Sequence, residues 1–220
     1  MRFRSVIPAV VLLFAARGPA CAASLIANGD FSAALSDWQQ VGNVFNTGET
    51  AVLSDSAAPR VVVFQTAVVP DGIVLVQLSF DLLTALSPVA GLGQTPDSVF
   101  ISAFLGATPF GLNFDAGTFD SAAGVLDADY RGLANPGSQL VSGPSPKGAG
   151  WRRYSLPLPP AAFATVAFEF IDGNGVPGDS TIAVDNVFLE AIPIPEPECL
   201  AVLAASIFVI PGLGRRRRGP

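Results

Sequence analysis

The chain has 220 residues, 50% of them hydrophobic, and a formal net charge of −6. It contains no histidine, and its two cysteines, Cys21 and Cys199, lie in the terminal segments. Residues 23–192 therefore have no disulfide, no catalytic thiolate and no histidine to act as a general base. They carry five basic and sixteen acidic residues, a formal charge of −11. This charge argues against nucleic-acid binding, because such binding depends on cationic contacts to phosphate.

The first 22 residues have the three parts of a signal peptide. Arg2 and Arg4 form a basic region, and Val6–Ala16 is apolar. Ala20-Cys21-Ala22 then supplies the small-x-small pattern that signal peptidase cuts, so we predict export and cleavage after Ala22. Lipidation of Cys21 is the alternative, and it is disfavoured because the preceding residues lack the aliphatic side chain that such sites usually carry.

Residues 23–192 predict one all-β domain, an antiparallel β-sandwich. Gly and Pro are dense, and short runs of β-branched and aromatic residues alternate with turn residues. The predicted strands are Arg60–Val69, Ile73–Leu83, Ser98–Leu105, Trp151–Leu156, Thr165–Ile171 and Thr181–Leu189. Because Pro70-Asp71-Gly72 is a turn signal, we expect the first two of these strands to pair as a hairpin.

Alternation of residue types predicts which side of a strand is buried. In the strand at 73–83 the expected core face consists of Val74, Val76, Leu78, Phe80 and Leu82. Gln77, Ser79 and Asp81 are expected on the opposite face, and Phe168 of a later strand is expected in the core, opposite Glu169. The stretch Asp115–Gly150 has little periodicity, apart from a short strand expected near Asp127–Leu133. A connection of that length is usually functional or mobile.

The two ends of the domain carry matching motifs. Near the start stand Asn28-Gly29-Asp30-Phe31 and Trp38, and near the end stands Asp185-Asn186-Val187 within an apolar strand. This pattern resembles the jelly-roll, galactose-binding-like domains of carbohydrate-binding modules and many surface proteins. Those domains open with an Asn-Gly-Asp/Ser-Phe-Glu motif and a Trp, and they close on a strand with Asp-Asp/Asn-Val. The resemblance implies a jelly-roll topology.

The same resemblance implies a structural calcium where the two ends meet. Carried over to this chain, its ligands would come from Asn28, Asp30 and Asp185, since calcium prefers carboxylate and carbonyl oxygens. Ser32 stands where the family usually has a glutamate, which removes one carboxylate ligand. The alternative is that Asn28-Gly29-Asp30 is a turn and that Asp185 bonds nearby amides. The sequence leaves both interpretations open.

Two further features are candidates for binding. Asp172-Gly173-Asn174-Gly175, followed by Asp179, resembles part of a calcium loop, but its glycine and asparagine content favours a simple turn. Tyr130, beside Arg131 in the irregular stretch, is the best candidate for an exposed ring on which a sugar would stack. Packing of Tyr130 against the domain is the alternative.

The C-terminal segment, 193–220, combines three features. Pro195-Glu196-Pro197 is followed by the apolar run Leu200–Leu213 and then by the four arginines Arg215, Arg216, Arg217 and Arg218. The apolar run is shorter than the ~20 residues that span a bilayer comfortably. The segment resembles the PEP-CTERM sorting signal, with its hydrophobic sorting helix. The resemblance implies cleavage near the Pro-Glu-Pro motif by an exosortase, after transient insertion in the inner membrane. An ordinary single-pass tail anchor is the alternative.

Together these features predict an exported, exosortase-processed protein of the cell surface or extracellular matrix. We expect a structural or adhesive role, in association with exopolysaccharide, and no enzymatic activity. A carbohydrate-binding module that recognises a specific glycan is the alternative. A glycosidase or lyase that uses two carboxylates is a more remote one, because nothing in the spacing singles out a pair.

Overall fold

The computed structural model describes residues 23–88, 91–109, 123–129, 132–133 and 141–193. The predicted signal peptide, Tyr130 and the predicted sorting segment lie outside these residues. Within the described part of the chain, no helix is long and apolar enough to cross a membrane.

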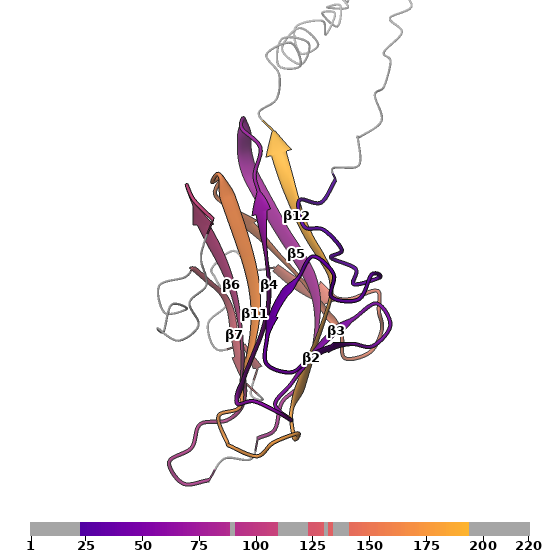
Figure 1. The fold of residues 1–220 in the computed structure, drawn as a ribbon, viewed down its shortest axis with the longest axis vertical. Helices are drawn as coiled ribbons and strands as arrows, with labels where there is room; N and C mark the ends of the chain where they lie inside the picture. The colour runs from indigo at the N-terminus through magenta and orange to yellow at the C-terminus, as the bar shows by residue number, and fades with distance from the viewer. Residues whose placement is uncertain (1–22, 89–90, 110–122, 130–131, 134–140, 194–220) are drawn as a thin grey trace, which may run out of the picture.

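The described residues form two antiparallel sheets that pack face to face (Figure 1). The first sheet contains, in spatial order, β1 (Gln39–Val41), β4 (Arg60–Val68), β11 (Phe163–Ile171), β6 (Ser98–Gly106), β7 (Ala123–Asp129) and β8 (Gly132–Leu133). The second contains β2 (Val44–Asn46), β3 (Ala51–Ser54), β12 (Thr181–Pro193), β5 (Ile73–Ala85), β10 (Arg152–Leu158) and β9 (Val141–Pro144). The prediction of an all-β antiparallel sandwich is confirmed.

Successive strands cross between the sheets, which is the jelly-roll pattern. From β3 to β6 each strand lies in the sheet opposite its predecessor, and β10, β11 and β12 alternate in the same way. At the centre of the first sheet, β11 pairs with β4 and β6, and at the centre of the second, β12 pairs with β3 and β5. The last strand is therefore a central one, which fixes the C-terminal end of the domain firmly.

The predicted hairpin between β4 and β5 is wrong. Pro70-Asp71-Gly72 does form a turn, but it carries the chain from one sheet to the other. β4 pairs with β1 and β11, and β5 pairs with β12 and β10. Both strands have an apolar face that must be buried, and facing each other across the core buries both.

Aromatic side chains fill the space between the sheets. Phe168 of β11 is fully buried, as its alternation predicts, and meets Phe80 of β5 edge to face with ring centroids 5.3 Å apart. Trp38 contacts both Phe168 and Phe31, so the N-terminal motif is attached to the core. Val74, predicted as a core residue, is 45% exposed.

Asp81 shows the opposite difference from Val74, because a residue expected on the outer face is buried. It lies on the outer face of β5, as the alternation predicts, yet its exposed fraction is 0%. Arg153 of the neighbouring strand and Asn186 of the last strand both bond its carboxylate. A buried carboxylate on an outer sheet face marks a place where the surface is covered and the chemistry is unusual.

Candidate functional site

The N-terminal motif is a turn that its own side chains hold together. Asn28 has a positive φ of 47°, a conformation that asparagine tolerates well. Its side-chain Nδ2 donates to the carbonyls of Ala34 and Ser36 at 2.9 and 3.0 Å, and its Oδ1 accepts from the N–H of Ala33. The indole of Trp38 donates to the Asn28 carbonyl at 3.0 Å. Asn28 and Trp38 therefore build the turn.

This turn meets the last strand, as the pairing of the two end motifs predicts. The N–H of Val187 donates to the carbonyl of Gly29 at 2.8 Å, and the N–H of Leu25 donates to the carbonyl of Leu189 at 2.7 Å. A Cβ on Gly29 would lie 1.9 Å from the carbonyl oxygen of Val187. Only glycine fits there, which gives a physical reason for the Asn-Gly-Asp sequence.

Opposite the turn, β12 contains an irregularity at Asn186, whose φ is 49°. The register with β5 shifts between Asp185 and Phe188, after a row in which Asp185 lies directly opposite Asp81. Two carboxylates directly opposite each other on adjacent strands repel. Their close approach requires positive charge nearby.

Two basic side chains supply that charge. Lys147 forms an ion pair with Asp185, and its ammonium also lies 5.0 Å from the centre of the Trp151 ring. Arg153 donates to both carboxylate oxygens of Asp81 at 2.9 and 2.7 Å. Asn186 completes the arrangement. We call this group the outer-face network; its members are Asp81, Asp185, Asn186, Lys147 and Arg153.

The hydrogen bonds of the network determine the charge state of Asp81. Burial alone would raise the pKa of this carboxyl. Hydrogen bonds from Arg153, Asn186 and Ser145 outweigh burial and hold the pKa of Asp81 below its ordinary value. The same contact with Asp81 raises the pKa of the Arg153 guanidinium. Asp81 and Arg153 are therefore a tightly bonded ion pair.

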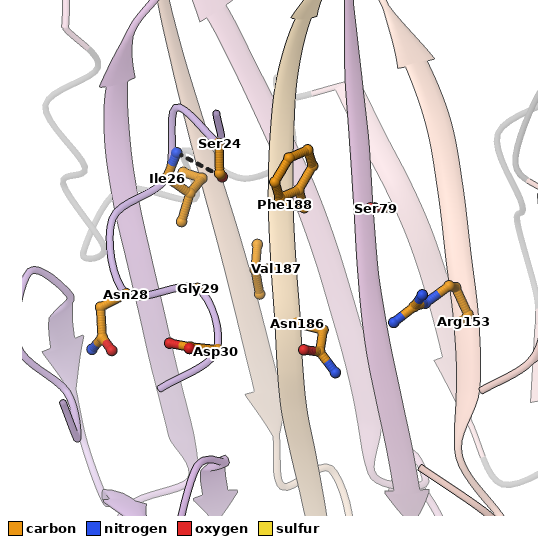
Figure 2. Close-up of a pocket in the computed structure, with 10 residues that line it drawn as sticks. All are labelled: Ser24, Ile26, Asn28, Gly29, Asp30, Ser79, Arg153, Asn186, Val187 and Phe188. Atoms are coloured by element: carbon orange, nitrogen blue, oxygen red, sulfur yellow. Dashed lines mark hydrogen bonds between the residues drawn. The ribbon is translucent and has the colours of Figure 1, made fainter. Parts of the chain in front are cut away.

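A shallow pocket of about 560 Å³ lies between the turn and the outer-face network (Figure 2). Asp30, Asn186 and Arg153 contribute polar groups to it, and Phe188 contributes a half-buried ring. The remaining lining residues are Ser24, Ile26, Asn28, Gly29, Ser79 and Val187. The pocket thus combines one ring with charged, amide and hydroxyl groups.

Asp30 is the exposed acid of this pocket. One of its carboxylate oxygens accepts from both the N–H and the hydroxyl of Ser32, at 3.2 and 2.9 Å. The hydrogen bonds from Ser32 lower the pKa of Asp30. Ser32 is therefore the hydrogen-bond partner of Asp30.

The structure brings the backbone of Asn28–Asp30 to the last strand, and the carboxylates of Asp30 and Asp185 have separate partners. Asp185 pairs with Lys147, which also lies 3.4 Å from the hydroxyl of Thr50. The chain's own ammonium therefore neutralises the carboxylate that the resemblance assigns to calcium, and Asp30 bonds Ser32 instead. Calcium at this position stays a prediction.

The second acidic segment has partners that sequence reasoning missed. Asp172 lies beside Asp55 and Asp97, with one carboxylate oxygen of each within 4.8 Å of the others. We call Asp55, Asp97 and Asp172 the acidic end cluster. Asp55 and Asp97 stand alone in turn sequences far from Asp172, so only the fold could reveal the group. Asp172-Gly173-Asn174-Gly175 is also a turn, as predicted, in which the N–H of Gly175 donates to Asp172.

Comparison with known proteins gives distant structural similarities only. No family model matches the chain, and no curated protein does. An enzymatically active domain of tailspike protein 4 of bacteriophage CBA120 is similar over 77% of this chain, with 18% identity and a TM-score of 0.44. This chain spans only 21% of that tailspike chain.

Two carbohydrate-binding modules are similar to this chain with equally low sequence identities and TM-scores. TmCBM61, solved with β-1,4-galactotriose, has 11% identity and a TM-score of 0.45, covering 76% of this chain and 98% of the module. A CBM4 module has 12% identity and a TM-score of 0.39, covering 76% of this chain and 99% of the module. Because these similarities are so distant, neither the ligand of one nor the activity of another transfers to this chain.

Proposed function

We propose that this chain is an exported, non-catalytic surface protein, a β-sandwich that an exosortase releases from the inner membrane. The observation that carries the proposal is the three-part C-terminal segment, with Pro195-Glu196-Pro197, the apolar run Leu200–Leu213 and four arginines in that order. Signal peptidase would remove residues 1–22 during export. The released domain would then act at the cell surface or in the extracellular matrix.

The position of the last strand supports this processing. β12 is a central strand of its sheet and ends at Pro193, two residues before Pro195. A protease that cuts near the Pro-Glu-Pro motif would thus act just beyond the folded domain, without removing a strand from the sandwich. The acidic domain would remain soluble after release, because its formal charge of −11 opposes association.

A structural or adhesive role fits the pocket better than catalysis does. Arg153 is already bonded to Asp81, and Asp30 is bonded to Ser32. A glycosidase requires two carboxyl groups on either side of a bond, one of them with a raised pKa. Among the described residues, Asp30 is the one acid that lines the pocket, and its pKa is lowered. We therefore place the protein among matrix components associated with exopolysaccharide.

Specific saccharide binding is the second candidate, and the pocket favours it. A sugar can stack its apolar face on a ring while its hydroxyl groups bond charged and amide side chains. Phe188 offers such a ring, and Asn186 and Arg153 lie on the same face of the sheet (Figure 2). This position differs from Tyr130, the residue that the sequence suggested, which lies outside the described residues.

Intact mass of the mature protein from its native host tests the processing. We expect a C-terminus near Pro195–Pro197 and loss of all four tail arginines. Glu196→Ala should leave uncut precursor in the membrane, because the enzyme loses its motif while the apolar run remains. Glu198→Ala, just outside the motif, is the matched control and should be processed normally. Full-length protein at the cell surface would contradict the proposal.

A glycan array separates the two roles. Binding to a defined glycan that Phe188→Ala abolishes and Phe45→Ala retains would establish the second candidate. Phe45 is a suitable control because its ring is 40% exposed on β2 and does not line the pocket. Absence of any defined glycan ligand, together with normal release from the membrane, would support the structural role.

A further inference from the structure

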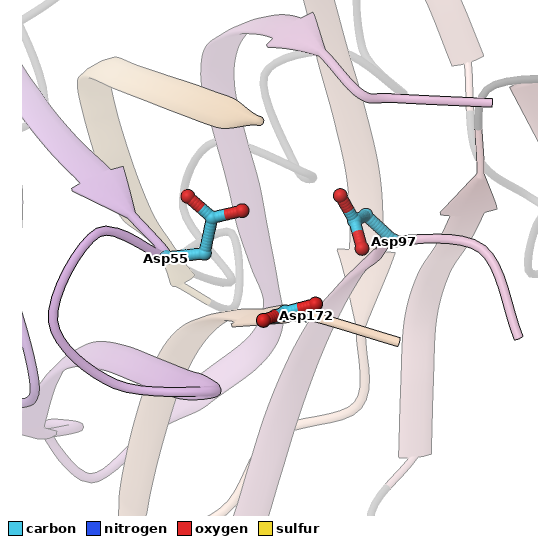
Figure 3. A group of neighbouring side chains, drawn as sticks. All are labelled: Asp55, Asp97 and Asp172. Atoms are coloured by element: carbon cyan, nitrogen blue, oxygen red, sulfur yellow. The ribbon is translucent and has the colours of Figure 1, made fainter. Parts of the chain in front are cut away.

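The acidic end cluster joins the two sheets at one end of the sandwich (Figure 3). Asp55 directly follows β3 of the second sheet. Asp97 directly precedes β6, and Asp172 directly follows β11, both strands of the first sheet. The loops that carry Asp97 and Asp172 lie at the end opposite the C-terminal end of β12 (Figure 1). None of the three residues belongs to the position where the resemblance places calcium.

These carboxylates are buried without a basic partner. Asp97 has an exposed fraction of 0% and Asp55 of 2%, and Asp172 is half-buried. Among the described residues, no lysine or arginine forms an ion pair with any of the three. Removing a charged group from water costs several kcal/mol unless an opposite charge or hydrogen bonds compensate. Repulsion among the three acids adds to that cost.

Hydrogen bonds compensate Asp97 but not Asp55. One oxygen of Asp97 accepts from the N–H groups of Gly173 and Asn174 at 3.0 and 3.3 Å, and the other accepts from the Asn174 amide at 3.2 Å. Ser180 also donates its hydroxyl to Asp97. Asp55 receives one bond, from the N–H of Gly178 at 2.7 Å to Oδ1.

The second oxygen of Asp55, Oδ2, has no hydrogen-bond partner in the described part of the chain, although it is buried. It is the one buried side-chain polar atom of the described residues in that condition. The carboxylate of Asp55 faces those of Asp97 and Asp172 (Figure 3). An unsatisfied buried oxygen of this kind requires an explanation, and a bound ion is one of the standard ones.

We propose that Asp55, Asp97 and Asp172 together bind one calcium ion, with the free Oδ2 of Asp55 as a ligand. All three donors are hard carboxylate oxygens, the ligand type that calcium prefers over the nitrogen and sulfur ligands of zinc. Two oxygens bound to one calcium lie at most about 5 Å apart, which accommodates the separation of up to 4.8 Å found here. Magnesium, with bonds of about 2.1 Å, would require a tighter group.

The ion would act as a clamp between loops of the two sheets. Calcium would supply the positive charge that the chain itself supplies to Asp81 and Asp185 but does not supply here. A proton shared between Asp97 and the neighbouring Asp179 is the competing explanation, because burial and the hydrogen bond with Asp179 raise the pKa of Asp97, and burial also raises the pKa of Asp55. The two explanations differ in their response to calcium, which makes them separable.

The test uses the full chain, purified in detergent and stripped of metal with a chelator. Addition of calcium at a hundredfold excess over its Kd should raise the melting temperature by roughly 5–10 °C at pH 7. Magnesium at the same concentration should do much less. Isothermal titration should give one calcium per chain. A rise of equal size with magnesium would indicate screening of an acidic surface and overturn the proposal.

Variants locate the ion. Asp55→Asn and Asp172→Asn should each abolish the calcium-specific rise, and Asp172→Asn guards against misfolding because its side chain is only half-buried. Asp71→Asn, on an exposed turn, and Asp185→Asn, in the outer-face network, should retain the rise. Retention in Asp55→Asn and Asp172→Asn would overturn the proposal. So would a wild-type protein with no calcium response, which is what a shared proton predicts.

Discussion

The protein has two groups of buried aspartates, and basic side chains compensate the charge of one group but not of the other. In the outer-face network, Asp81 and Asp185 lie opposite each other and are neutralised by Arg153 and Lys147. In the acidic end cluster, three aspartates lie together without an ion pair to a described basic residue. The domain has only five basic residues, and two of them are committed to the first group. The chain itself neutralises the first group, whereas the second has no such partner among the described residues and is the group where we propose that calcium binds.

The largest expected effect comes from removing a base in the complete group. Arg153→Met should destabilise the domain by about 2–3 kcal/mol, because it leaves Asp81 buried without its ion pair. The cost is below that of a fully buried pair since the Arg153 side chain is 44% exposed. Urea unfolding at pH 7 measures the change.

Arg152→Met is the matched control for this variant, because Arg152 is the exposed neighbour on the same strand and donates to the hydroxyl of Ser142 rather than to a buried carboxylate. It should change the free energy of unfolding by less than about 0.5 kcal/mol. Equal effects of the two substitutions would mean that the Asp81–Arg153 pair contributes nothing specific.

Lys147→Met should have the next largest effect, about 1–2 kcal/mol, because Lys147 bonds one carboxylate oxygen of Asp185 whereas Arg153 bonds both oxygens of Asp81, and because Asp185 keeps its bond from the Asn186 N–H. This variant also tests the calcium position implied by the two end motifs. With the ammonium removed, Asp185 and Thr50 are left to accept a cation. A new calcium response in thermal unfolding, additional to that of the end cluster, would show that Lys147 stands in for a metal.

Much of the fold follows from the sequence. Alternation of apolar and polar residues identified the strands and placed Phe168 in the core, because a buried face imposes a period of two on any strand. The pairing of β4 and β5 could not be derived in this way. Pro70-Asp71-Gly72 specifies that the chain turns, but not whether the turn stays in one sheet or crosses between two. That choice depends on which other strands fill the remaining positions.

The sites were less predictable for a different reason. Ion pairs and acidic clusters join residues from distant loops, so no local pattern reveals them. Lys147 lies in the irregular stretch before β10, and nothing in its neighbourhood indicates Asp185 as its partner. Asp55 and Asp97 each look like ordinary turn acids. The end motifs were informative because their contact is made through the backbone and requires glycine at position 29. Such a requirement can be recognised in the sequence itself.

In the acidic end cluster, a substitution that removes a charge should stabilise the domain, whereas in the outer-face network it should destabilise it. Asp55→Asn in chelator at pH 7 should raise the free energy of unfolding by about 1 kcal/mol, because the amide keeps an acceptor for Gly178 and no longer carries a buried charge. Differential scanning calorimetry measures the change. A loss of stability on this substitution in metal-free protein would mean that Asp55 is already neutral, and the contrast between the two groups would fail.

The smallest effect is the pH dependence of the outer-face network. The pKa of Asp81 is lowered in the folded state from its ordinary value of 3.8, so the folded state binds the proton less readily than the unfolded state. Its contribution to stability is then fully present above pH 3.8 and is lost as the pH falls through the lower, folded-state pKa.

The groups around this carboxyl are Arg153 and Ser145 on one side and Asn186, Asp185 and Lys147 on the other. Arg153 stays protonated throughout this range because its pKa is raised, so the titration followed here is that of Asp81. Urea unfolding of the wild type and Asp81→Asn should therefore give a difference that is constant between pH 5 and 7 and shrinks below pH 3.8. A difference that persists unchanged to pH 2 would show that Asp81 contributes by packing and neutral hydrogen bonds, and not as the charged partner of Arg153.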